Sequence, residues 1–204
     1  MTEASPISPT QLLEGLRAIV GEKACLDASA DMQPFTTDYR KLYHGKALAV
    51  VLPATTQQVS DVLALCSRHQ IPVVPQGGNT SLMGGAVPDD VGDAVVLNLR
   101  RMNQVQEIDS VNDTMTLQAG VTLQAARAAA EDAGRLFPLR IGSEGSCQIG
   151  GNLSTNAGGT AVLRYGNMRD LTLGIEAVLP DGRIYSSLRG LRKVLMTYSS
   201  PSGA

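Results

Sequence analysis

A glycine-rich stretch at residues 75–85, PQGGNTSLMGG, contains the residue types best suited to binding chemistry in this chain. Glycine permits positive φ angles and lets a ligand approach the peptide N–H groups closely. Asn79, Thr80 and Ser81 add amide and hydroxyl donors between the two glycine pairs. Successive backbone N–H groups that turn toward one point bind anions. The stretch therefore predicts an anion-binding loop, although bulges and tight turns use the same residue types.

A second stretch of the same character lies at residues 145–159, GSCQIGGNLSTNAGG. Like the first stretch it is rich in Gly, Asn, Ser and Thr and contains no charged residue. We expect one helical turn over residues 152–157, with backbone N–H groups presented at its start. Two such loops predict one large ligand that contacts both.

The common nucleotide motifs do not explain these loops. A Walker A loop needs Lys and then Ser or Thr after its second glycine. Here Gly84 and Gly85 are followed by Ala86 and Val87. Neither loop contains the G-x-G-x-x-G pattern of a Rossmann dinucleotide site. The loops therefore belong to another class of binding site.

No catalytic side chain stands out in the sequence. The chain has two histidines, His44 and His69, and no C-x-x-C pair, which argues against a metal site and a hydrolase base. A packing role is favoured for Cys147 over a redox role, because no cationic neighbour in the sequence would lower its pKa. If chemistry takes place in this chain, a bound cofactor must supply it.

Residues 47–99 hold the elements expected to position the first loop. Residues 47–52 form a short apolar run that predicts a buried strand, and Thr55 and Gln58 form a capping box at the start of a helix. Residues 71–74 predict a second strand, so this part reads as a βαβ unit that ends in the first glycine loop. An earlier helix is expected from Ser8 to Gly21, and residues 31–46 read as an irregular segment.

The later residues predict shorter elements. We expect a meander of short strands at residues 94–99, 105–108 and 114–119, then a helix from Thr122 through Ala133 that ends at Gly134. A strand at 171–179, a turn at 180–182 and a return strand at 183–185 form a hairpin.

The overall composition describes a globular protein. The 204 residues are 43% hydrophobic and 18% charged, which suits an ordinary packed core. The net charge is −2 and the Lys and Arg residues are scattered, so the sequence shows no basic patch that would bind nucleic acid. No run reaches the roughly 18 apolar residues of a membrane span, and the N-terminus does not read as a signal or transit peptide. Three widely spaced cysteines argue for a reducing compartment, so we expect a cytoplasmic protein.

Residues 47–88 and 145–183, which contain the two loops, resemble a known family. They are similar to the FAD-binding domain of the vanillyl-alcohol oxidase/p-cresol methylhydroxylase (PCMH-type) superfamily. The best match is its branch of FAD-linked 2-hydroxy-acid dehydrogenases, which act on D-2-hydroxyglutarate, D-lactate or glycolate. The resemblance covers roughly residues 35–193. It implies an α+β fold of two subdomains, one around a small parallel sheet and one around an antiparallel sheet, with FAD between them.

The resemblance also implies a set of cofactor-binding residues. Residues 76–82 would hold the FAD pyrophosphate through backbone amides, and the second loop would line the flavin and ribityl side. The implied FAD-binding residues are Gln76, Gly77, Gly78, Asn79, Thr80, Ser81, Leu82, Pro138, Leu139, Gly145, Ser146, Cys147, Ile149, Gly150, Gly151, Asn152, Asn156, Ala157 and Gly158. We expect non-covalent FAD, because neither loop contains a His.

The implied function is the oxidation of a 2-hydroxy acid to a 2-oxo acid by hydride transfer to flavin N5, with electrons passing to an acceptor other than oxygen. We expect a helical lead-in at 1–34, an incomplete FAD domain at 35–193 and a disordered tail at 194–204 that departs from the family pattern. This departure suggests a C-terminal truncation. The alternative function is therefore a catalytically inactive flavin-binding remnant, and a homodimer is one assembly that the resemblance allows.

Overall fold

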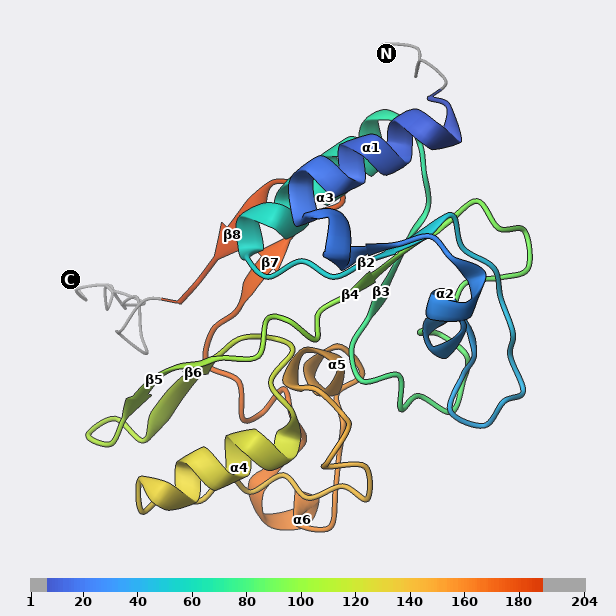
Figure 1. The fold of residues 1–204 in the computed structure, drawn as a ribbon. Coiled ribbons are helices and arrows are strands. Elements are labelled where there is room, and N and C mark those ends of the chain that lie inside the picture. The colour runs from blue at the N-terminus through green and yellow to red at the C-terminus, as the bar shows by residue number, and fades with distance from the viewer. Residues whose placement is uncertain (1–6, 189–204) are drawn as a thin grey trace, which may run out of the picture.

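The computed structural model describes residues 7–188. The expected tail at 194–204 lies outside this range, as does the expected domain boundary at residue 193. Figure 1 shows a small sheet covered by helices and, beside it, a group of short helices with a hairpin. We call residues 7–102 the sheet lobe and residues 103–174 the loop lobe.

Helix α1 (Pro9–Val20) begins and ends where the sequence predicts. The Ser8 side chain accepts from the Gln11 backbone N–H at 3.2 Å, and the Gln11 side chain accepts from the Ser8 backbone N–H at 3.1 Å. Gly21 ends the helix with a φ of 88°. The helix buries Leu12, Leu16 and Val20 along one face, as its apolar spacing requires.

A four-stranded sheet is the centre of the sheet lobe, with strands in the order β1-β2-β4-β3. A short 3₁₀ helix, Glu22–Ala24, leads into β1, and β1 is antiparallel to β2 while β2, β4 and β3 run parallel. The strand bounds are Cys25–Leu26 for β1, Ala49–Val51 for β2, Val73–Gln76 for β3 and Val95–Asn98 for β4. Every residue of β2 and β4 is buried, and all of them except Asn98 are apolar, as expected of strands covered on both faces.

Both faces of this sheet are covered. Val51 and Val95 pack on the side of α1 and α3 (Thr56–Arg68), whereas Val50 and Val96 pack against Met32 and Phe35 on the other side. The second group comes from α2 (Ser29–Thr36), which lies on the opposite face in Figure 1. Alternate side chains of one strand thus enter two different cores.

Two predictions for this lobe are wrong. Residues 29–36, read in part as irregular, form α2 with Pro34 inside the helix. Residues 95–98 do not belong to a meander with the strands that follow them, because β4 lies between β2 and β3 in the parallel sheet. The capping box at α3 is half present: Thr55 accepts from the Gln58 N–H, but the Gln58 side chain accepts from Ala54.

The loop lobe contains short elements around a smaller core. Its antiparallel hairpin and three helices are β5 (Val105–Asp109), β6 (Thr114–Leu117), α4 (Leu123–Asp132), α5 (Ile149–Ser154) and α6 (Val162–Tyr165). Thr122 caps α4 by accepting from the Ala125 N–H, and Gly134 follows the helix with a φ of 69°. Helix α5 begins three residues before the predicted turn. The core contains Val121, Leu123 and Met168, with α4 packed across it.

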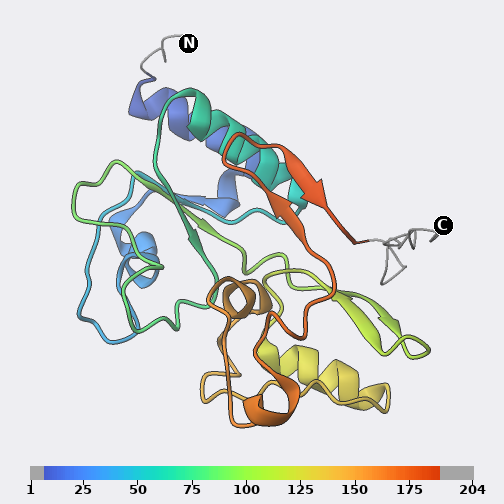
Figure 2. The ribbon, with the colours of Figure 1, turned by 180° about the vertical axis from the view of Figure 1, so that it is seen from behind.

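The last hairpin returns to the sheet lobe. Strands β7 (Glu176–Val178) and β8 (Ile184–Ser186) are shorter than the strand predicted over 171–179. Ser60 Oγ donates to the Gly182 carbonyl at 2.5 Å, so the turn of the hairpin is attached to α3. Figure 2 shows the hairpin along that helix. Apart from β1, the antiparallel strands of residues 7–188 form two separate two-stranded hairpins, β5–β6 and β7–β8. No helix of residues 7–188 has the length and apolar character needed to cross a membrane.

Candidate functional site

The site begins at the carboxyl ends of β3 and β4, where Gln76 and Asn98 are register partners. Both amide side chains are buried, with exposed fractions of 3% and 1%. Asn98 Nδ2 donates to Gln76 Oε1 and to the Gly77 carbonyl, each at 2.9 Å. Gln76 Nε2 donates to the carbonyls of Phe35 and Ala86 at 2.8 and 2.6 Å. This buried network fixes the start of the first glycine loop relative to α2 and the sheet.

The backbone N–H groups of residues 77–82 are the most distinctive feature of that loop. None of them donates a hydrogen bond to another residue in the range 7–188. Asn79 has a φ of 51°, and its Nδ2 donates to the Thr37 carbonyl at 2.8 Å, which ties the loop to the end of α2. Consecutive unpaired N–H groups held in a fixed loop form an anion-binding nest.

The second glycine loop is held by residues 119–123 of the loop lobe. The backbone N–H groups of Leu123, Ile149 and Gly150 donate to the carbonyls of Cys147, Val121 and Ala119 at 3.0, 2.9 and 2.8 Å. The two loops touch at Gly78, where an added Cβ atom would overlap the carbonyl oxygen of Ser146. A Cβ at Gly77 would lie 3.2 Å from Gln148 Oε1. Glycine is needed at Gly78 because only a residue without a side chain permits this approach.

A third segment, residues 38–45, forms another wall of the site. Asp38 Oδ1 accepts from the backbone N–H groups of Leu42 and Tyr43 at 2.7 and 2.8 Å, and Oδ2 accepts from Arg40 at 3.2 Å. These bonds stabilise the charged carboxylate, with the Tyr43 N–H as the largest cause, and lower the pKa of Asp38. Asp38 therefore organises this segment as an anion, and its lowered pKa makes it a weaker base than an ordinary carboxylate.

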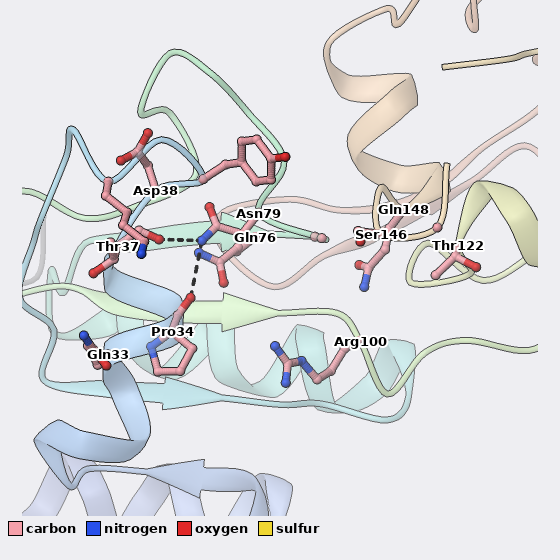
Figure 3. Close-up of a pocket in the computed structure, with 15 residues that line it drawn as sticks. Gln33, Pro34, Thr37, Asp38, Gln76, Asn79, Arg100, Thr122, Ser146 and Gln148 are labelled. Atoms are coloured by element: carbon pink, nitrogen blue, oxygen red, sulfur yellow. Dashed lines mark hydrogen bonds between the residues drawn. The ribbon is translucent and has the colours of Figure 1, made fainter. Parts of the chain in front are cut away.

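These three segments, with residues of α2, Arg100 and Thr122, line an open cavity of about 700 Å³. Figure 3 shows Gln76 and Asn79 near its middle, Pro34 and Thr37 on one side, and Ser146, Gln148 and Thr122 on the other. The lining residues are Gln33, Pro34, Thr37, Asp38, Tyr39, Lys41, Gln76, Gly77, Gly78, Asn79, Arg100, Thr122, Gly145, Ser146 and Gln148. The volume is typical of sites for small molecules and cofactors.

Several polar groups of the wall fit a phosphate-bearing ligand with further hydroxyl or amine donors. The unpaired N–H groups of residues 77–82 suit phosphate oxygens. Asn79 Oδ1 and Gln148 Oε1 are buried and have no hydrogen-bond partner within residues 7–188. A buried acceptor without a partner is costly, so each of these oxygens is suited to a donor on the ligand. The chemistry of the wall therefore fits FAD, which carries a diphosphate, ribityl hydroxyls and ring donors.

The structure separates the predicted site residues into groups. Gln76, Gly77, Gly78, Asn79, Gly145 and Ser146 line the cavity, whereas Thr80, Ser81 and Leu82 continue the first loop beyond the lining. Leu139, Cys147 and Ile149 are buried in the core of the loop lobe. The remaining predicted residues also belong to the loop lobe: Pro138, Gly150, Gly151, Asn152, Asn156, Ala157 and Gly158. Contact of any of these residues with FAD stays a prediction.

Sequence reasoning missed much of the wall. The lining residues it did not select are Gln33, Pro34, Thr37, Asp38, Tyr39, Lys41, Arg100, Thr122 and Gln148. One signal was present at residues 31–46, where aromatic and basic side chains gather without periodicity. Another was Arg100, a cation that follows a buried strand directly. Within residues 7–188, no three His, Cys, Asp or Glu side chains come together as metal ligands would.

Comparison with known proteins agrees with this geometry. A family model described as "FAD binding domain" matches residues 47–187, more than half of the chain. The chain belongs to this FAD-binding domain family. The match spans both glycine loops and the strands that hold them. The predicted cofactor, FAD, is thereby confirmed.

Two relatives and one solved structure show which kinds of FAD-binding protein this chain is similar to. A Schizosaccharomyces pombe protein, provisionally named a mitochondrial D-lactate dehydrogenase, is 48% identical over 80% of this chain and 31% of its own length. The mitochondrial D-2-hydroxyglutarate dehydrogenase of Arabidopsis thaliana is 40% identical over 87% of this chain and 31% of its own length. The chain thus spans about a third of these relatives.

The structure of p-cresol methylhydroxylase with substrate bound has a TM-score of 0.69, with 21% identity, over 87% of this chain and 35% of that protein. The predicted α+β, PCMH-type FAD-binding fold is therefore confirmed. The resemblance to this superfamily and its 2-hydroxy-acid dehydrogenase branch is confirmed as well.

Proposed function

We propose that this chain is the flavin-binding part of an FAD-dependent oxidoreductase that oxidises a 2-hydroxy acid to the 2-oxo acid. The observation that carries the proposal is the cavity between the two glycine loops, with its unpaired N–H groups at residues 77–82. The substrate class is supported by the names of the relatives, which are dehydrogenases of D-lactate and D-2-hydroxyglutarate.

The cavity residues have a binding role in this proposal. The amides of residues 77–82 hold the diphosphate, while Asn79 Oδ1 and Gln148 Oε1 accept from donors on the cofactor. FAD, when bound, would supply the redox chemistry as the hydride acceptor for the substrate carbon that carries the hydroxyl. Asp38 already accepts three backbone N–H groups, so we place the group that takes the substrate proton outside the described cavity wall.

The second candidate is a flavin-binding chain without turnover of its own. It is favoured because the one carboxylate among the lining residues, Asp38, has a lowered pKa and is a weaker base than an ordinary carboxylate. The two candidates share FAD binding and differ only in whether a 2-hydroxy acid reduces the bound flavin.

Anaerobic reduction separates these candidates. The purified chain is saturated with FAD, freed of excess by gel filtration and mixed with D-lactate, D-2-hydroxyglutarate or glycolate. The L-enantiomers of the two chiral acids are the controls, and dithionite shows that the flavin can be reduced. Bleaching of the visible flavin bands by one acid supports the enzyme, and bleaching by dithionite alone supports the second candidate. A chain that elutes without flavin would contradict both.

We also propose that the flavin is held non-covalently. The Cys147 side chain is buried and receives a hydrogen bond from Asn152 Nδ2 at 3.6 Å, and neither glycine loop contains a His. Acid precipitation of the loaded protein should then release all of the FAD into the supernatant. Yellow colour that remains in the pellet would indicate a covalent bond.

Three further proposals concern the location of the protein, its assembly and its electron acceptor. We propose a cytoplasmic location from the cysteine usage, whereas the S. pombe and A. thaliana relatives are named mitochondrial. Fractionation of cells that express the tagged gene distinguishes the two compartments. Light scattering tests a homodimer, and reoxidation rates with oxygen and with quinone-type dyes test for an acceptor other than oxygen.

A further inference from the structure

The cavity lining carries a net positive charge, because it holds two cations and one carboxylate. Its cationic lining residues are Lys41 and Arg100, and neither takes part in an ion pair within residues 7–188. The one lining carboxylate, Asp38, already accepts three backbone N–H groups. A cavity with this balance attracts an anion.

Arg100 is exposed, but three contacts hold it in place. Its backbone N–H and its Nε both donate to Asn98 Oδ1, at 3.1 and 3.2 Å. Its Cζ atom lies 4.3 Å from the centroid of the Phe35 ring, within the range of a cation–π contact. In Figure 3 the guanidinium extends from the end of β4 toward the space between Pro34 and Gln148.

The two terminal nitrogens of this guanidinium are available to a ligand. Of its five N–H donors, only the Nε–H has a partner within residues 7–188. The remaining donors form the planar fork that pairs with two oxygens of a phosphate or carboxylate. Because Phe35 and Asn98 fix the other parts of the side chain, little conformational freedom is lost when the fork binds.

Asn98 links this cation to the first glycine loop. Its Oδ1 accepts from Arg100, while its Nδ2 donates to the Gly77 carbonyl at 2.9 Å. One buried amide therefore sets the position of both the guanidinium and the loop with the unpaired N–H groups. This link favours the same anion for both, rather than a separate anion at Arg100.

We propose that Arg100 pairs with the diphosphate of the bound FAD and that Asn98 is its positioning residue. This assignment rests on the proposed flavin binding and adds a cation to a loop whose expected contact with the diphosphate is through backbone amides alone. Arg100 and the N–H groups of residues 77–82 together neutralise the diphosphate, the first by charge and the second by hydrogen bonds.

The variant Arg100→Gln tests this assignment, with Arg101→Gln as the matched control. Arg101 neighbours Arg100 but donates to the Leu52 carbonyl at 2.8 Å and does not line the cavity. We expect Arg100→Gln to weaken FAD binding by about 10- to 100-fold, the loss typical of one charge-assisted pair. Arg101→Gln should bind FAD within about twofold of the unchanged chain, a difference smaller than one ordinary hydrogen bond.

Three ligands show which part of FAD is involved. Arg100→Gln should weaken binding of ADP, which has the diphosphate without the flavin, by a factor similar to that for FAD. Binding of riboflavin, which has no phosphate, should be unchanged. The affinity of Arg100→Gln for FAD should also depend less on salt, because one ionic contact is lost. The Arg100→Lys variant keeps a point charge, so its affinity for FAD should lie between those of the unchanged chain and Arg100→Gln. If Arg100→Gln does not fold, Arg100→Lys gives the same comparison.

The outcomes separate this assignment from the proposed function. Unchanged FAD affinity in Arg100→Gln, or an equal loss for FAD and riboflavin, would overturn the assignment alone. If FAD affinity is unchanged but binding of a 2-hydroxy acid is weakened, Arg100 pairs with the substrate carboxylate and the assignment is wrong. An unchanged chain that binds no FAD would overturn the proposed function and, with it, this role of Arg100.

Discussion

The sheet lobe and the loop lobe meet at the same cavity but are held together differently. In the sheet lobe, β2 and β4 are completely buried between α1 and α3 on one face and α2 on the other. In the loop lobe, the β5–β6 hairpin is exposed or half-buried, and helices α5 and α6 have few residues. A two-stranded hairpin is marginally stable on its own.

This difference assigns each lobe a part in the site. The sheet lobe supplies a fixed edge, where Gln76 and Asn98 orient the first glycine loop and Arg100. The loop lobe comes close to that edge through the backbone carbonyl of Ser146 and the side chain of Gln148. Binding sites at the carboxyl ends of parallel strands commonly combine a rigid sheet with adaptable loops in this way.

The largest expected effect contrasts a buried leucine with an exposed one. Leu16 in α1 is fully buried, whereas Leu163 in α6 is fully exposed. We expect Leu16→Ala to lower the free energy of unfolding by about 2–5 kcal/mol and Leu163→Ala by less than about 0.5 kcal/mol. Urea denaturation followed by circular dichroism measures both. A similar loss in the two variants would show that the lobes do not differ as described.

The next effect tests the contact between the lobes at Gly78. A methyl group at this position would overlap the Ser146 carbonyl, so Gly78→Ala must separate the two glycine loops. We expect a loss of about 1–3 kcal/mol in stability and the loss of FAD binding. Gly85→Ala is the control in the same loop, because its added Cβ meets no atom within 4 Å. Equal FAD affinity in both variants would mean that the close approach is not required.

A smaller effect compares two helix caps, one in each lobe. Thr55 accepts from the Gln58 N–H at 3.1 Å and Thr122 accepts from the Ala125 N–H at 3.2 Å. Replacing either by Ala should cost about 0.5–2 kcal/mol of stability. Only Thr122 lines the cavity, so only Thr122→Ala should also weaken FAD binding, as measured by fluorescence titration. An equal change of FAD affinity in both variants would contradict the boundary drawn for the cavity.

Local signals in the sequence predicted the helices well. Ser8, Thr55 and Thr122 each cap the helix that follows, because a cap depends on residues only three positions apart. Helix α2 was missed since Pro34 lies inside it and Ala28, which precedes it, offers no side-chain cap. The order of β2, β4 and β3 could not be read either, because strand order depends on contacts between distant residues.

For the site, too, local signals were readable from the sequence and contacts between distant residues were not. The glycine loops were visible because their composition is unusual, and the prediction that one ligand contacts both loops followed from that composition. Asp38 and Arg100 were not selected, since each is an ordinary charged residue until the fold brings it to the cavity. The contact of Gly78 with Ser146 likewise needs the two lobes to be placed against each other.

The smallest expected effect is the pH dependence of the 38–45 segment. The pKa of Asp38 is lower in the folded protein than in the unfolded chain, so its contribution to stability is fully present above the ordinary carboxyl pKa of about 4. That contribution is lost as the pH falls through the lowered value. The chain has no Trp and five Tyr, and two of these, Tyr39 and Tyr43, belong to the same segment as Asp38, so tyrosine fluorescence contains a signal from this segment. Asp38→Asn should remove the acid transition in this signal, and a transition that persists would assign it to another group.

Amide hydrogen exchange with and without FAD tests most directly whether one ligand bridges the two lobes. We predict that saturating FAD slows exchange at residues 77–82 and at residues 145–152 together, because both loops line one cavity and the N–H groups of the first have no partner within residues 7–188. The β5–β6 hairpin, which does not line the cavity, should exchange at an unchanged rate. Protection of a single loop, or of neither, would contradict a cofactor site that spans both glycine loops.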